Sequence, residues 1–596
     1  MKKTEKKKKS GFLFWFILLA VLFALVLEFS RNTVPGWILA AGLFALFFLL
    51  HRRFLKTKPR ALRFLGWIVL LALLVLDLAV TAPPYRAIPA VRGKDIAKTD
   101  VISVAQGDLV GVFNTEKTVE VYAGIPYAQP PVGDLRWREP QEPSSWEGIR
   151  VCDHFAPMSM QQRNPVIMDS LTLLVGYRTF TVSLQDNFRE PVSEDSLYLN
   201  VWKPAGEQAG LPVIFFIHGG SLMTGQPSFG DYNGESLAER GVVFVNFGYR
   251  LNVFGYYAAE DLAAESPNGT TGNYGLLDQI AALRWVKDNI AAFGGDPDNI
   301  TIAGESAGSS SVNALCVSPL AKGLFRRAIA ESSGITAIKP YHTFRPLEKA
   351  LEMGIRIREE FGTTSSSDLR AIPAEKLVGT AFSNNSMTVD GYAIVEEPYR
   401  TYEKAENNEE ALLNGFNGRE ADVFNLTMTV GKNNYPALVE NIFHGETDTV
   451  LALYPEATKK NMTTLLSAAW FAYSHYDWSR RLCAQGKPVY EYYFTRQNRS
   501  LGDWHSGEMI YAYGNLENAP QNYDAEDRAL SEIMQQYWVN FARTGDPNGE
   551  GLPVWPLVSD APGQVLNFDR DVRMMEDPFL PLDEILDRVQ NAEKAE

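Results

Sequence analysis

A serine flanked by glycines is the feature of this sequence with the clearest chemical potential. The motif Gly304-Glu305-Ser306-Ala307-Gly308 follows a short apolar run, Ile300–Ala303, and precedes a segment of small residues. A strand, a tight turn and a helix in that order would expose the Ser306 hydroxyl above the edge of a sheet. Glycines on both sides permit such a turn, because they carry no Cβ that would clash. With 46 glycines in the chain, such a motif also arises by chance, so its context carries the prediction.

A nucleophilic serine needs donors for the oxyanion that forms when it attacks a carbonyl carbon. The stretch His218-Gly219-Gly220-Ser221 directly follows the apolar run Val213–Ile217. Glycines leave backbone N–H groups accessible, so Gly219 and Gly220, together with the amide of Ala307, are the predicted oxyanion donors. An ordinary Gly-Gly turn is the alternative interpretation of this stretch.

The same serine needs a base, and in α/β-hydrolases an acid and then a histidine follow the serine along the chain. Acidic residues after Ser306 are too numerous for a choice on physical grounds. Chain order leaves four histidines open, namely His342, His444, His475 and His505. Residue types alone therefore predict the chemistry without identifying the acid and the base.

The elements that would hold these groups alternate between short apolar runs and amphipathic segments. Leu277–Phe293 has apolar residues at helical spacing and stops at Gly294-Gly295. The less regular stretch from about 340 to 400 is expected to be a helical cap or an insertion. Three runs are predicted to be strands buried on both faces: Val213–Ile217, Val242–Phe247 and Ile300–Ala303. This pattern predicts an α/β fold, with a mostly parallel central sheet and helices on both faces.

The first 80 residues contain three apolar runs, Gly11–Leu27, Val34–Leu50 and Phe64–Val80. Each run has about 17 residues, the low end of what spans a bilayer as a helix. The lysines before the first run resemble the start of a signal peptide, but two further runs argue against that interpretation. Buried helices of a soluble protein are the other alternative. We expect residues 1–80 to form a three-helix anchor that meets the membrane through residues 11–80.

Basic residues between the runs predict the orientation of this anchor. Six lysines precede the first run, and Arg31 alone lies between the first two. The second and third runs are separated by Arg52, Arg53, Lys56, Lys58, Arg60 and Arg63. The N-terminus is therefore expected on the cytoplasmic side of the plasma membrane. Residues 81–100 are expected to be a linker, and residues 101–596 a domain outside the cell.

Charge and cysteine content exclude several classes of function. Residues 1–63 contain 13 basic and two acidic residues, although the whole chain has a net charge of −15. The remaining chain is strongly acidic, which argues against nucleic-acid binding. Three cysteines are too few for a disulfide-built scaffold, and no metal-ligand spacing occurs. We expect no cofactor and no metal, and the oligomeric state stays open.

From about residue 103 to 570 the chain resembles the type-B carboxylesterases of the α/β-hydrolase superfamily. This family also contains cholinesterases, para-nitrobenzyl esterases and the non-catalytic neuroligins. The matching stretches occur in order along the chain: 124–137, 194–204, 218–221, 273–308, 318–334, 504–508 and 537–548.

The resemblance implies a role for particular acids and one histidine. The base is expected at His505, in the family's His-x-x-Glu stretch, where Glu508 matches the glutamate. The acid is expected in a segment similar to G-x-N-x-x-E, which places it at Glu420, with Asp422 and Asp390 as alternatives.

Ser159, Ser196 and Glu305 are three further positions with an expected structural role. The family often joins two cysteines where this chain has Ser159 and Ser196, so the loop between them is expected to lack a disulfide. Glu305 is expected to point away from Ser306 and to be a buried supporting residue.

These features predict a serine carboxylic ester hydrolase that works through an acyl-enzyme, with Ser306, Glu420 and His505 as a catalytic triad. Its partner would be a small-molecule ester of unidentified structure. A neuroligin-like adhesion module without catalysis is one alternative. A lipase or an acyltransferase that uses the same site is another.

Overall fold

The computed structural model describes residues 11–163, 165–172, 174, 187–334, 344–382 and 385–595. The chain divides into two compact units. The first comprises Met1–Arg86 and Arg163–Pro191, and the second comprises Ala87–Gln162 and Val192–Glu596. The first unit thus includes a segment, Arg163–Pro191, that lies within the range predicted for the outer domain. His342 and the lysines before Gly11 lie outside the described residues.

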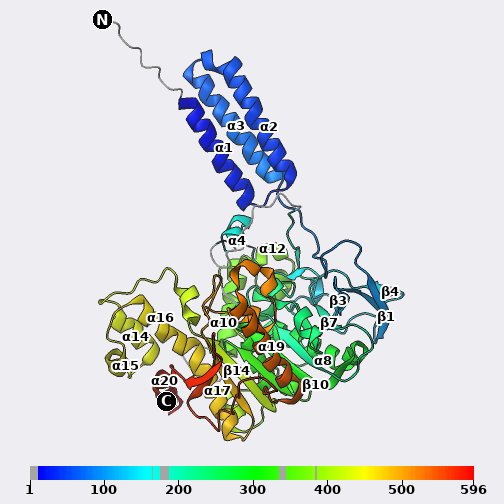
Figure 1. Cartoon of the computed structure of the whole chain (residues 1–596), viewed down its shortest axis with the longest axis vertical. Coiled ribbons are helices and arrows are strands. Elements are labelled where there is room, and N and C mark those ends of the chain that lie inside the picture. Colours follow the sequence, from blue (N-terminus) through cyan, green and yellow to red (C-terminus); the bar gives the residue numbers. More distant parts are fainter. Residues whose placement is uncertain are drawn as a thin grey trace. The chain divides into compact units, whose positions relative to one another are not determined.

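Three long apolar helices dominate the first unit (Figure 1): α1 (Gly11–Phe29), α2 (Val34–Arg53) and α3 (Arg60–Val80). Each contains one of the predicted runs, and each is long and apolar enough to cross a membrane. With 1.5 Å per residue their lengths are about 30 Å, which matches the hydrocarbon thickness of a bilayer. Most of their apolar side chains stay exposed, as expected for helices surrounded by lipid.

A polar network holds one end of these helices together. The Asn32 side chain, in the turn between α1 and α2, donates to the Leu78 carbonyl (2.9 Å) and to the Thr81 hydroxyl (2.8 Å) at the end of α3. The Thr33 amide donates to the Thr81 carbonyl at 3.0 Å. A Cβ on Gly36 would lie 2.5 Å from the Thr81 hydroxyl, so glycine allows α2 and α3 to approach closely here.

Described residues of the first unit outside its helices also contact one another. Tyr85 forms a parallel bridge with Arg189, and the Arg86 amide donates to the Arg189 carbonyl at 2.9 Å. The guanidinium groups of Arg163 and Arg189 lie 5.3 and 6.0 Å from the centre of the Tyr85 ring. A short helix, α4 (Val166–Thr172), lies beside the end of α1 that is farther from the N-terminus (Figure 1).

A 13-stranded sheet forms the centre of the second unit. Its order is β1-β2-β3-β7-β9-β8-β10-β11-β14-β15-β16-β17, and β4 pairs with β2. Neighbouring strands from β9 through β16 are parallel. The other pairs along this order are antiparallel, and β4 lies parallel to β2. The strands are β1 (Lys98–Val104), β2 (Gly107–Phe113), β3 (Val119–Pro126), β4 (Ile149–Val151), β7 (Tyr198–Pro204), β8 (Leu211–Ile217), β9 (Val243–Phe247), β10 (Gly295–Glu305), β11 (Arg327–Glu331), β14 (Ala411–Asn417), β15 (Val489–Phe494), β16 (Gln564–Phe568) and β17 (Arg573–Glu576).

Helices cover this sheet on both faces, and two small sheets lie beside it, β5 (Met158–Ser159) with β6 (Val192–Ser193) and β12 (Arg345–Pro346) with β13 (Thr388–Val389). The helices are α5 (Glu235–Glu239), α6 (Asn252–Tyr256), α7 (Glu260–Glu265), α8 (Tyr274–Asn289), α9 (Ala307–Val317), α10 (Leu347–Glu360), α11 (Ser366–Arg370), α12 (Ala374–Leu377), α13 (Pro398–Glu403), α14 (Tyr435–Phe443), α15 (Thr447–Leu453), α16 (Lys459–Ser467), α17 (Tyr473–Ala484), α18 (Met509–Ala512), α19 (Ala525–Thr544) and α20 (Leu580–Ala595).

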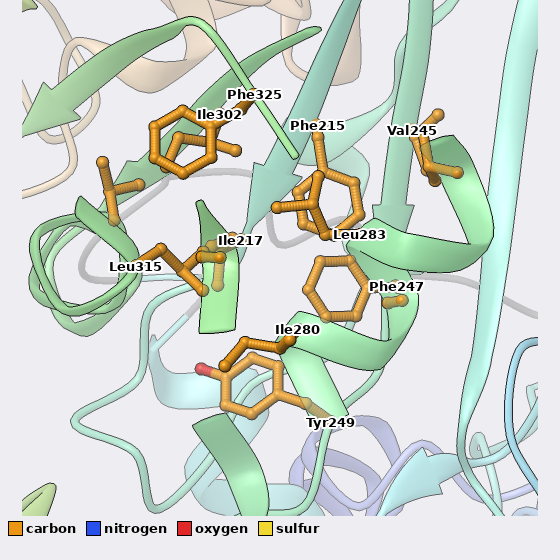
Figure 2. Close-up of a cluster of buried hydrophobic side chains, with 14 of the residues drawn as sticks. Phe215, Ile217, Val245, Phe247, Tyr249, Ile280, Leu283, Ile302, Leu315 and Phe325 are labelled. Carbon is orange, nitrogen blue, oxygen red and sulfur yellow. The ribbon is translucent and has the colours of Figure 1, made fainter. Parts of the chain in front are cut away.

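The core lies on both faces of the parallel strands. Alternate residues of β8 belong to two different clusters: Phe215 and Ile217 pack in one, and Ile214 and Phe216 in the other. Figure 2 shows the first cluster, where Ile280 and Leu283 of α8 lie among side chains of the strands. Complete burial of Val213–Ile217 on both faces explains why this part of β8 is continuously apolar.

The predicted elements appear with shifted ends. Helix α8 spans Tyr274–Asn289, and a 3-10 turn, η5 (Ile290–Phe293), continues it to Gly294. Gly294 has φ of 82°, which is the reason that glycine ends this segment. The described part of the stretch from 340 to 400 is partly helical, with α10, α11 and α12 beside the short strands β12 and β13. In the segment expected to be a linker, Ala90 donates to the Asp153 carbonyl and Ile88 accepts from the Phe155 amide, both at 2.8 Å.

Candidate active site

Ser306 occupies the turn between β10 and α9. Its backbone has φ of 57° and ψ of −125°, a conformation that a residue with a side chain rarely adopts. Its amide donates to the Glu331 carbonyl at the end of β11 (2.9 Å), which holds the turn in place. The carboxyl ends of parallel strands meet at one edge of a sheet, and this edge is where ligands bind in open α/β folds.

The two glycines of the motif are required by close backbone contacts. A Cβ on Gly304 would lie 2.5 Å from the carbonyl carbon of Gly308. A Cβ on Gly308 would lie 2.0 Å from the Ile217 carbonyl oxygen at the end of β8. The start of α9 can therefore pack against β10 and the end of β8 only when both positions lack a side chain.

The structure brings Ser306, His505 and Glu420 together in one hydrogen-bonded series. Nε2 of His505 lies 2.8 Å from Oγ of Ser306, and Nδ1 lies 2.5 Å from Oε2 of Glu420. Glu420 begins a 3-10 turn, η7 (Glu420–Asn425), shortly after β14, and its Oε1 accepts from the Asn417 amide at 2.7 Å. The carboxylate is fully buried and therefore has a fixed orientation toward the imidazole.

The other candidate acids and histidines that the structure describes have different partners. Asp422 pairs with Arg419 at 3.1 Å, and Asp390 accepts from the Thr270 hydroxyl at 2.5 Å. His475 is buried on α17, with Nδ1 3.0 Å from Oδ1 of Asn414. His444 follows α14.

Glu305 is a further acid at the imidazole. Its Oε1 lies 3.3 Å from Nε2 of His505 and accepts from the Ser506 hydroxyl at 2.6 Å. The side chain is buried, as expected for a supporting residue. Sequence reasoning missed its contact with His505, because it considered only the direction of Glu305 relative to Ser306.

These carboxylates control the charge of His505. Burial lowers the pKa of His505, but the negative charges of Glu305 and Glu420 outweigh burial and raise this pKa to about 9. Burial also raises the pKa of Glu305, although the nearby His505 acts in the opposite direction. The imidazole and Glu305 are therefore linked, because His505 holds its proton less tightly whenever Glu305 is neutral.

A further buried carboxylate, that of Glu508, lies next to Ser306, His505 and Glu420. Glu508 accepts from the Ser332 hydroxyl at 3.1 Å and from the side-chain amide of Asn417. Burial, followed by the charges of Glu420 and Glu305, raises the pKa of Glu508 to about 8. Glu508 thus connects the loop of His505 to β14, the strand that precedes Glu420.

A cavity of about 320 Å³ opens beside Ser306. Ser310, Ser333, Asn385 and Ser386 form a polar part of its wall, and Leu222 and Met387 add apolar surface. Its aromatic part consists of Phe424, Trp470 and Phe471. A volume of this size suits a small organic ligand.

The aromatic residues of the cavity wall were not predicted from the sequence. The rings of Phe424 and Phe471 each lie 5.0 Å from the His505 ring. Trp470 and Phe471 belong to a π-helical turn, η8 (Ala468–Ala472), between α16 and α17. π-Helical turns occur often at functional sites, but no short sequence motif predicts them.

The glycine-rich stretch after β8 borders Ser306 directly. A Cβ on Gly219 would lie 3.0 Å from Cβ of Ser306, and Gly220 has φ of 110°. Ser221, with φ of 57°, lines the cavity together with Ala307. The backbone of this loop therefore lies at the Ser306 side chain, and Ser221 is a wall residue that sequence reasoning did not assign.

The described residues contain no group of three or more His, Cys, Asp or Glu side chains that could hold a metal ion. The three cysteines of the chain, Cys152, Cys316 and Cys483, are all free thiols.

Comparison with known proteins gives consistent similarities. The Carboxylesterase family matches residues 98–581. A medium-chain fatty acyl-CoA hydrolase precursor of Anas platyrhynchos is 33% identical over 515 residues, covering 79% of this chain and 86% of that protein. The fumonisin B1 esterase of Sphingopyxis macrogoltabida is 32% identical, with coverage of 77% and 85%. A crystal structure of a Geobacillus stearothermophilus carboxylesterase superimposes with a TM-score of 0.70 at 32% identity, covering 82% of this chain and all of that one.

Proposed function

The chain belongs to the carboxylesterase family and is a carboxylic ester hydrolase, and we propose that it cleaves its ester through an acyl-enzyme on Ser306. The similarities confirm the predicted family and the predicted α/β-hydrolase fold. The observation that carries the proposal is the series in which His505 lies 2.8 Å from the Ser306 hydroxyl and 2.5 Å from Glu420. These are distances at which protons transfer between side chains.

The first half of the proposed reaction acylates the enzyme. His505 Nε2 takes the proton of Ser306 as Oγ attacks the ester carbonyl carbon, which forms a tetrahedral oxyanion. Backbone amides of Gly219, Gly220 and Ala307 would stabilise this oxyanion, and loss of one such donor typically costs about 3 kcal/mol. The carbon–oxygen bond to the alcohol then breaks, and His505 returns its proton to the leaving alkoxide.

The second half releases the acid. Water loses a proton to His505 and attacks the acyl carbon, and the serine oxygen leaves and recovers that proton. Glu420 keeps Nδ1 of the imidazole protonated and stabilises the imidazolium in both halves. The original Ser306 proton leaves with the alcohol, a proton from water replaces it, and the enzyme returns to its starting state, so this cycle needs no cofactor.

We propose that α1, α2 and α3 anchor this enzyme in the plasma membrane, with the N-terminus in the cytoplasm and the hydrolase unit outside. Their length and apolar composition support three membrane spans. The basic residues before α1 and between α2 and α3, with a single arginine between α1 and α2, support the orientation.

The alternatives differ in their support. A non-catalytic adhesion module would not require a complete serine, histidine and acid series beside a cavity. A lipase or an acyltransferase would use the same Ser306 and differ only in its substrate or its acceptor, so it shares the proposed chemistry.

The proposal is tested by labelling the detergent-solubilised full-length enzyme with a fluorophosphonate. We expect covalent labelling of the wild type, no labelling of Ser306→Ala, and a loss of kcat on a p-nitrophenyl ester of about 10⁶-fold. Ser559→Ala, at an exposed serine, is the control and keeps both properties. Labelling of Ser306→Ala, or full hydrolysis by it, would refute the role of Ser306.

A further inference from the structure

Helix α4 directs apolar side chains outward and buries a serine. Ile167 and Leu171, one turn apart in α4, lie on one helical face, and Leu174 follows two positions after the end of the helix. Their exposed fractions are 38%, 37% and 40%, and that of Met168 is 50%, whereas Ser170 is fully buried. A short helix in contact with water would be expected to have the reverse arrangement.

The surroundings of α4 indicate what covers this apolar face. The helix belongs to the same compact unit as α1, α2 and α3, and it lies beside α1 (Figure 1). The exposed side chains of these long helices are themselves apolar, so the face of α4 adds to a surface that is suited to lipid.

A second feature is typical of the boundary between lipid and water. Tyr85 follows the end of α3 by five residues, is 59% exposed, and has the guanidinium groups of Arg163 and Arg189 against its ring. Aromatic rings and arginine side chains are enriched at the level of the lipid headgroups. Arg163 precedes the first residue of α4 by three positions, so α4 begins close to this level.

We propose that α4 lies in the membrane interface, with Ile167, Met168, Leu171 and Leu174 against the acyl chains of the lipid. This inference rests on the proposed anchoring of the enzyme by α1, α2 and α3. An interfacial helix that is short and has one apolar face binds through the apolar area that it buries. The enzyme would thus contact the bilayer with a part of the chain far from its N-terminal spans in sequence.

The test measures the surroundings of a spin label in the full-length enzyme, reconstituted in phosphatidylcholine vesicles. Leu171→Cys is made in a Cys483→Ser background, since Cys152 and Cys316 are buried, and a nitroxide is attached. Collision rates of the nitroxide are measured with oxygen, which concentrates in lipid, and with a water-soluble nickel chelate. Val75→Cys on α3 is the lipid reference, and Val554→Cys in the hydrolase unit is the aqueous reference, with exposed fractions of 65% and 78%.

We expect the ratio of oxygen to nickel collisions at position 171 to exceed that at position 554 severalfold and to approach that at position 75. A ratio equal to that at position 554 would overturn the proposal. Low collision rates with both reagents would also overturn it, because they would mean that protein, such as a second copy of the chain, covers α4. Ile167→Cys repeats the measurement on the same face of α4, and Leu174→Cys repeats it just beyond the end of the helix.

The reference label at position 75 and fluorophosphonate labelling distinguish failure of the α4 placement from failure of membrane anchoring or of folding. If the label at position 75 were itself accessible to nickel, the membrane anchoring would fail, and the placement of α4 would fail with it. Fluorophosphonate labelling of each variant reports on an intact hydrolase unit, so a folding defect is recognised independently of the lipid contact.

Discussion

His505 is the residue whose charge decides when the proposed mechanism can begin. A general base must be neutral to accept the serine proton, and two buried carboxylates raise the pKa of His505 to about 9. Glu420 is needed to orient the imidazole, whereas Glu305 contacts Nε2, the nitrogen that faces Ser306. At the scale of single residues, Glu305 is therefore expected to set the pH range of activity.

Glu305→Gln is predicted to move the acidic limb of the pH–activity profile to lower pH. Hydrolysis requires neutral His505, so kcat/KM rises as pH increases through the pKa of His505. Removal of the Glu305 charge lowers this pKa, and an adjacent charge typically contributes about 1–3 pH units. The profile is measured with p-nitrophenyl acetate, and Glu517→Gln, at an exposed glutamate, is the control. An unchanged acidic limb in Glu305→Gln would show that Glu305 does not hold a charge on the imidazole.

At the scale of elements, a buried ion pair connects α8 to the chain that follows β9. Asp278 on α8 accepts from Nε of Arg250 at 2.8 Å, from its NH2 group at 2.7 Å and from its backbone amide at 3.0 Å. Both side chains are almost completely buried. Such a pair fixes the position of α8 against the sheet, because neither charge can find water if the contact is lost.

Asp278→Ala is predicted to lower the free energy of unfolding by about 3–5 kcal/mol, because it leaves the Arg250 charge buried without its partner. Unfolding in urea is followed by loss of fluorophosphonate labelling and by tryptophan fluorescence in detergent. The matched control is Asp298→Ala. This change removes the exposed ion-pair partner of Lys287, which also lies on α8, and it should leave stability nearly unchanged. Equal stabilities of the two variants would contradict the importance of the buried pair.

The whole molecule combines two units whose surfaces differ in polarity. The first contains helices whose outward surface is apolar, and the second is a hydrolase unit with a large two-sided core. Apart from its basic N-terminal region the chain is acidic, which favours solubility of the hydrolase unit and repels anionic surfaces. The distribution of lysine and arginine around the helices makes the orientation of the molecule testable.

A protease added to intact cells is predicted to digest the hydrolase unit and to spare the N-terminus. Epitopes at the two ends of the chain report each side of the membrane on an immunoblot. We expect loss of the C-terminal epitope in intact cells, and loss of the N-terminal epitope only after lysis. Survival of the C-terminal epitope in intact cells, together with its digestion after lysis, would reverse the orientation.

Much of this structure was predictable because the responsible residues are close together in sequence. The apolar runs of β8, β9 and β10 correspond to buried parallel strands, and the three N-terminal runs correspond to α1, α2 and α3. The resemblance to a known family indicated Glu420 and His505 as candidates, which residue types alone could not select. The aromatic wall of Phe424, Trp470 and Phe471 escaped prediction, because no local pattern connects η7 with the π-helical turn.

The sequence by itself determined the turn at Ser306, since the spacing of Gly304 and Gly308 is a local requirement of a strand that reverses into a helix. Only the tertiary structure decided which groups meet that serine. His505 is 199 positions away and Glu420 is 85 positions from His505, and parallel strands bring the loops after them to one edge of the sheet. The same holds for the contact of Glu305 with His505 and for the outward apolar face of α4. Both depend on neighbours that are distant in sequence and come together only in the folded chain.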